Sequence, residues 1–127
     1  METFKMKKLL NDILFCHELT ITQDKKAWIT NYEIDYNIAK LLIISDIIEQ
    51  DSGNFETGEK HYIINFYSMT IFERINKFRK MLNDKKNMFL TPPFADIKNQ
   101  LLKDLDYIEI QYSRMYKLKK IEKNKII

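Results

Sequence analysis

The sequence has only two glycines, two prolines and one cysteine among its 127 residues. A single cysteine, Cys16, excludes a disulfide within the chain and favours a reducing compartment, so we expect a cytoplasmic protein. The longest uninterrupted apolar run, Leu41–Ile44, is far shorter than the ~18 residues that a membrane span requires. The N-terminal segment carries a charge inside its apolar part and has no small-residue cleavage site, so we expect neither a secretory signal nor membrane insertion.

The chain also lacks the motifs that identify an enzyme. Cys16 and His17 are adjacent, and adjacent helix positions diverge by about 100°, so the two would not face each other as nucleophile and base. His61 has no second His or Cys nearby to complete a metal site. The segment FETGEKH lacks the glycine spacing of a phosphate-binding loop. We therefore expect a protein that is not an enzyme, with no metal and no cofactor.

The residues that are present predict one folded domain spanning 1–127. Hydrophobic residues make up 45% of the chain and aromatic residues 13%, which favours a packed core over disorder. Apolar residues recur at helical spacing in 4–16, and a capping box, Thr70 with Glu73, begins a second amphipathic helix over 70–83. We also expect a short helix over 23–30 that buries Ala27 and Trp28.

The middle of the chain predicts a helix followed by a β-hairpin. Asp35 is an N-cap for a helix that buries Ile38, Leu41 and Leu42. Residues 46–51 fit either the end of that helix or a strand, because short apolar runs do not distinguish the two. The next residues are a loop with both glycines, and 61–67 is rich in Tyr, Ile and Phe, which favours a strand. Residues 20–22 are β-branched and predict another very short strand.

The last predicted element is a long helix from Phe94 to Ile121, opened by Pro92 and Pro93. Its apolar residues step by three or four, close to a heptad seam. At 1.5 Å per residue, ~28 residues span ~42 Å, longer than a compact domain of this size. The seam therefore predicts either a homodimer or a helix lying along its own domain. The predicted dimer contacts are Leu101, Leu105, Ile108, Tyr112 and Met115.

This order of elements resembles that of winged helix-turn-helix domains, on the residues IAKLLIISDIIEQD, the wing SGNFETGEK and the strand HYIINFY. The resemblance covers 4–67, and 68–127 resembles an added helical, dimerising extension. The implied fold is α+β and predominantly helical, with a small β-hairpin and a long C-terminal helix. In such domains one helix enters the major groove of DNA and the loop contacts the backbone.

The resemblance implies two groups of DNA contacts, with candidate base contacts at Tyr32, Tyr36, Asn37 and Lys40 and phosphate contacts at Lys25, Lys26 and Lys60. A basic helix adds Arg74 and Lys77 as electrostatic candidates. The chain would then be a non-enzymatic, dimeric DNA-binding regulator, or a segregation or replication accessory factor of a mobile element.

The distribution of charge favours an alternative. Residues 23–60 carry a net charge of −4, whereas 68–90 carry +4 and 114–127 carry +5. A DNA-binding surface with a net negative charge would be repelled by the anionic duplex. The second hypothesis is therefore a small protein-interaction module, such as a phage- or plasmid-type inhibitor or an assembly subunit, whose acidic segment binds a basic protein partner.

Overall fold

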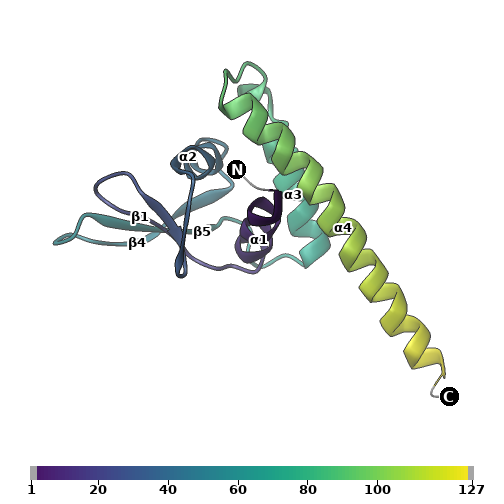
Figure 1. Cartoon of the computed structure of the whole chain (residues 1–127). Helices are drawn as coiled ribbons and strands as arrows, with labels where there is room; N and C mark the ends of the chain where they lie inside the picture. Colours follow the sequence, from purple (N-terminus) through teal and green to yellow (C-terminus); the bar gives the residue numbers. More distant parts are fainter. Residues whose placement is uncertain (1–2, 126–127) are drawn as a thin grey trace.

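The computed structural model describes residues 3–125, with side chains from Met6 to Lys119. Its fold is α+β and predominantly helical, as predicted, but the predicted small β-hairpin is part of a five-stranded antiparallel sheet against which the helices pack (Figure 1). The elements in chain order are α1 (Thr3–Leu14), β1 (Leu19–Ile21), β2 (Ala27–Ile29), β3 (Tyr32–Ile34), α2 (Tyr36–Ile44), β4 (Ile48–Asn54), β5 (Glu59–Ile64), α3 (Ile71–Leu82), the 3₁₀ turn η1 (Lys85–Asn87) and α4 (Phe94–Lys125).

Helix α1 confirms the predicted N-terminal helix but ends at Leu14. Cys16 has a positive φ of 66°. The N–H of His17 donates to the carbonyl of Asp12 and that of Cys16 to Ile13. These two bonds form a Schellman cap, which satisfies carbonyls that the helix end leaves unpaired. The local role of the Cys16–His17 pair is thus to end a helix.

The predicted helix over 23–30 is wrong. Residues 23–25 form a turn, and Ala27–Ile29 is strand β2, paired with β1 on one side and β3 on the other. Ala27 and Ile29 are buried while Trp28 between them is half-buried, which is the alternation of a strand with one covered face. The pairing satisfies the backbone groups of three-residue strands that have too little length to show a period in sequence.

Helix α2 begins as predicted, because the N–H of Asn37 donates to Oδ1 of Asp35 at 2.9 Å. It ends in a second Schellman cap, with Asp46 at a φ of 62°. This cap settles the open assignment of 46–51, since the chain turns there and enters β4 at Ile48.

The sheet has the strand order β3-β2-β1-β5-β4. Strands β4 and β5 with the loop 55–58 form a hairpin, here called the wing hairpin (residues 48–64). A bulge between Gln50 and Ser52 shifts its register. The inner face of the sheet, toward the helices, carries the buried side chains of Leu19, Ala27, Ile29, Ile34, Ile48 and Ile64.

Helix α3 starts at the predicted capping box, in which Oγ1 of Thr70 accepts from the N–H of Glu73 and the Glu73 carboxylate accepts in return. Its apolar stripe packs Ile75 and Phe78 into the core. The connection at 85–87 contains a buried polar residue. Asn87 is buried there, and its amide donates to Oγ of Ser45 at 3.2 Å and to the carbonyl of Met81 at 2.9 Å.

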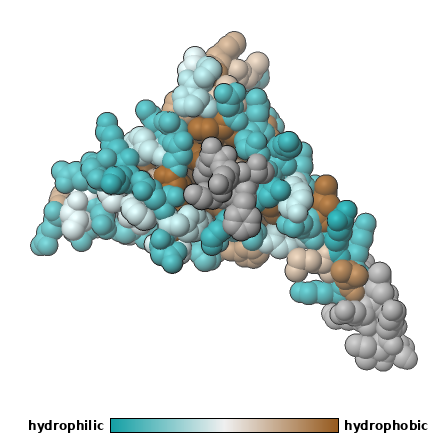
Figure 2. Space-filling view, in the orientation of Figure 1, coloured by the Kyte–Doolittle hydropathy of each residue, from teal (hydrophilic) through white to brown (hydrophobic). Residues whose placement is uncertain are grey.

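Helix α4 packs along the domain for its first half and then projects away from it (Figure 1). Leu101, Leu105 and Ile108 are buried in the chain's own core. These three predicted dimer contacts are therefore core residues, in line with the alternative in which the helix lies along its own domain. Tyr112 is half-buried, and Met115 lies on the projecting part with 52% of its surface exposed. Figure 2 shows apolar and polar surface alternating along that part.

None of the helices within 3–125 combines the length and the apolar character that crossing a membrane would take.

Candidate nucleic-acid interface

A groove lies between α2, the β1–β2 turn and the wing hairpin, and we call it the α2 groove. Its volume is about 290 Å³. Strand β1 and its turn form one wall, α2 the second, and the loop and strand β5 of the wing hairpin the third. Its lining residues are Ile21, Thr22, Gln23, Lys25, Tyr36, Ile43, Gly58, Lys60 and Tyr62.

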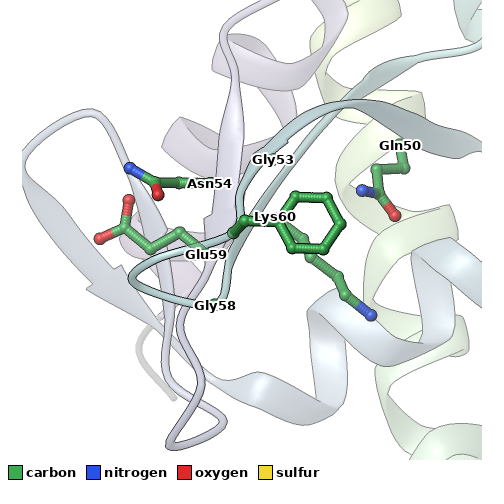
Figure 3. Close-up of a pocket in the computed structure, with 7 residues that line it drawn as sticks. Gln50, Gly53, Asn54, Gly58, Glu59 and Lys60 are labelled. Carbon is green, nitrogen blue, oxygen red and sulfur yellow. The ribbon is translucent and has the colours of Figure 1, made fainter.

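A second hollow, of about 310 Å³, continues from the α2 groove along the wing hairpin. Gly58 and Lys60 line both. Figure 3 shows that Gln50 and Lys60 point to one side of the hairpin, whereas Asn54 and Glu59 point to the other. Phe55, in the hairpin loop beside this hollow, is fully exposed. The two hollows together make a concave surface whose length follows the hairpin.

Strand register separates the charges of this region onto two faces. Lys60 pairs with Ile21 and Gly53, and Tyr62 pairs with Leu19 and Gln50, so these residues share the inner face. Acidic residues occupy the opposite, outer face. Glu49 pairs there with Ile63, Glu33 with Trp28, and Glu59 with Asn54. Successive residues of a strand alternate between faces, so a segment with a net charge of −4 still presents lysines in its groove.

The shape of the groove depends on a contact between Gln23 and Gly58. Gly58 has a φ of +72°, and a Cβ placed on it would lie 3.1 Å from Cβ of Gln23. Glycine adopts such a backbone without steric cost, and its lack of a side chain lets the β1–β2 turn approach the wing hairpin. This close approach brings the turn that carries Lys25 up to the strand that carries Lys60.

Two tyrosines line the groove between the lysines. Burial raises the pKa of Tyr62, and the nearby Tyr36 raises it further. The Tyr62 phenol is therefore uncharged at neutral pH and adds no negative charge to the groove. Tyrosine rings beside lysine ammonium groups are a combination that suits nucleic-acid backbones and bases.

The structure brings together three of the predicted DNA contacts, Lys25, Tyr36 and Lys60, in the α2 groove. Lys40 follows Tyr36 by one helical turn and so lies on the same stripe of α2. Its side chain is exposed, with Nζ 5.9 Å from the centre of the Phe94 ring.

Three other predicted contacts are engaged elsewhere. Lys26 forms an ion pair with Asp24 at 4.0 Å. The hydroxyl of Tyr32 donates to Asp12 of α1, and burial followed by this bond raises the pKa of Tyr32. Asn37 is half-buried in the first turn of α2, where its N–H serves the cap. Of the three, only the Tyr32 side chain is bound to another element, and none of them lines either hollow.

The two candidates on α3 do not reach the groove lining either. The guanidinium of Arg74 donates to the carbonyl of Leu14 at 2.6 Å and to that of Tyr67, which clamps α3 to the end of α1. Lys77 is exposed on α3 with Nζ 5.8 Å from the centre of the Phe66 ring. Arg74 is thus a structural clamp, and Lys77 is a separate surface charge.

Sequence reasoning missed several groove residues. Gln23, Gln50 and Tyr62 line the two hollows, but they carry no charge and belong to no motif. One signal was available for Tyr62. It follows Lys60 by two positions, so a strand at 59–64 places both on the same face.

Comparisons of the chain with models of protein families, with curated proteins and with solved structures find no match.

Proposed function

We propose that this protein binds double-stranded DNA through the concave surface formed by the α2 groove and the inner face of the wing hairpin. In this proposal it is a non-enzymatic, winged-helix-like regulator, or an accessory factor in replication or segregation, and it acts in the cytoplasm. The observation that carries the proposal is the separation of charge across the hairpin. Lys25, Lys60, Tyr36 and Tyr62 line the α2 groove, while Glu33 and Glu49 face away; Glu59 lines the second hollow beside Lys60.

The arrangement supports binding to the backbone more than reading of base sequence. Helix α2 has nine residues and a single charged side chain, Lys40. A β-hairpin, β2–β3, stands where a helix-turn-helix would place its first helix. Phosphate contacts position a protein on DNA without specifying sequence. We therefore propose that lysine–phosphate contacts supply most of the affinity.

The test is duplex binding measured by fluorescence anisotropy across a range of salt concentrations. The double variant Lys25→Glu/Lys60→Glu removes two cations from the groove. Each phosphate contact contributes about 0.9 to the slope of log K against log salt, so the slope is expected to fall by about 2. The double variant should also bind more weakly at every salt concentration.

The matched control is Lys80→Glu/Lys85→Glu, which changes the net charge equally on the exposed surface of α3 and η1. The proposal expects this control to keep most of the wild-type slope. An equal loss in the control would move the binding surface to the basic region 68–90. Absence of duplex binding by the wild type at low salt would overturn the proposal and leave the protein-interaction module as the function.

A further inference from the structure

The outer face of the sheet is an acidic surface with an apolar centre. Trp28, Thr20 and His61 lie in one cross-strand row, with Glu33 at the end of the row on β3. Glu18, Glu49 and Glu59 lie around them. Trp28, Ile63 and His61 are half-buried, and Glu33 and Glu49 are exposed. In the described part of the chain the helices pack on the inner face, so this surface is open (Figure 1).

The basic residues His61 and Lys26 lie near the outer face, but each already has a carboxylate partner there. Nδ1 of His61 lies 2.6 Å from the Glu18 carboxylate, and Nε2 lies 3.8 Å from that of Glu59. Lys26 pairs with Asp24. Glu33 and Glu49 have no cationic partner among the ion pairs of residues 6–119. An open face of this kind is complementary to a partner that is both cationic and partly apolar.

The chain itself contains a segment with that chemistry. The projecting part of α4 exposes Arg114, Lys117 and Lys119, together with Met115 and Leu118, which are 52% and 60% exposed. The sequence 114–127 has six basic residues and one acidic residue. In Figure 1 this helix points away from its own sheet, so it cannot cover the outer face of its own chain.

Electrostatics disfavours pairing two such arms with each other. A side-by-side pair would place two segments of charge +5 in contact, and like charges across a helix pair oppose association. The acidic outer face offers attraction in place of repulsion. We propose that the projecting part of α4 of one copy docks on the outer sheet face of a second copy, and that the exchange is reciprocal.

The dimensions fit this exchange. Neighbouring strands lie about 4.8 Å apart, so the five strands from β3 to β4 span about 19 Å. Residues 114–125 of a helix span about 17 Å. A helix of this length crosses the face from the strand of Glu33 to the strand of Glu49. Reciprocal docking uses each surface once in each copy and so closes as a dimer.

The test is a charge swap, measured by light scattering and sedimentation. One variant, Glu33→Lys/Glu49→Lys, makes the sheet face basic. The other, Lys117→Glu/Lys119→Glu, makes the arm acidic. The wild type is expected to be a dimer at low salt, and each variant alone is expected to be a monomer, because its face and arm then have charges of the same sign.

An equimolar mixture of the two variants is expected to recover a dimer, because both exchanged contacts are attractive again. Circular dichroism of each variant checks that it is folded. A monomeric wild type at low salt would overturn the proposal. So would a sheet variant that stays dimeric, which would indicate an arm-to-arm contact, or a mixture that fails to associate. Loss of duplex binding in the arm variant with no change of mass would assign the arm to DNA. This inference concerns the face opposite the groove and does not rest on the proposed function.

Discussion

Gly58 is the single residue on which the shape of the α2 groove depends most. Its φ is +72°, and a Cβ placed on it would lie 3.1 Å from Cβ of Gln23, closer than an ordinary van der Waals contact. We predict that Gly58→Ala lowers the free energy of unfolding by about 1–2 kcal/mol through the backbone conformation alone, with a further loss from the contact. Urea denaturation measures the total loss.

The variant Gln23→Ala/Gly58→Ala separates the two causes. It removes the contacts with Cδ and Oε1 of Gln23 but keeps Cβ of residue 23 and the unfavourable φ, so it should recover only part of the lost stability. Glu56→Ala, at an exposed position of the same hairpin loop, is the control and should change stability by less than about 0.5 kcal/mol. Full recovery in the double variant would show that the backbone conformation carries no cost.

The residues with positive φ also mark tight turns that the sequence did not reveal. The two glycines indicated where the chain turns tightly, and Gly58 confirms this, but Gly53 lies within β4. Four other turns place Cys16, Lys25, Thr30 and Asp46 at positive φ. Non-glycine residues adopt this conformation when the surrounding structure requires it, and a single sequence does not display that requirement.

Among the secondary-structure elements, α3 is held to the end of α1 by Arg74, which the sequence had suggested as a DNA contact. Arg74 joins the carbonyl of Leu14, after which α1 is capped, to that of Tyr67, which precedes α3. We predict that Arg74→Met lowers the free energy of unfolding by about 2–3 kcal/mol, because the partly buried bond to the Leu14 carbonyl and the exposed bond to the Tyr67 carbonyl both lose their charged donor. Thermal or urea denaturation gives this value.

The same variant should leave the affinity of the folded protein for DNA unchanged, since Arg74 lies outside the groove. Lys77→Met, three residues along the exposed side of α3, is the control and should alter stability by less than about 0.5 kcal/mol. A stable Arg74→Met protein with weakened DNA binding would contradict the structural assignment of this residue.

The predictability of each element followed the length of its local signal. Helices α1 and α3 were predictable because they repeat an apolar stripe over 12 residues, and α3 adds its capping box. Strands β2 and β3 have three residues each, too few for a period to emerge. Their pairing with β1 decides their structure, and that pairing is a tertiary property.

For the whole molecule, the arrangement of charge depends on register and cannot be obtained by adding charges along a segment. Residues 23–60 sum to −4, which argues against DNA binding as long as the segment is treated as one surface. The antiparallel sheet divides those residues between two faces, with Lys60 on one and Glu59 on the other. The sequence thus predicted Lys25, Tyr36 and Lys60 as candidate DNA contacts, but only the fold shows that they lie together in a groove.

The central claim is that DNA lies against the inner face of the wing hairpin, and an NMR titration with a short duplex tests it most directly. At low salt, the account predicts that backbone amide shifts cluster at residues 22–25, 36–43 and 58–62. The amides of Thr20, Trp28 and Glu33 on β1–β3 should move little. Shifts concentrated at those outer-face residues, or on α3, would contradict the account.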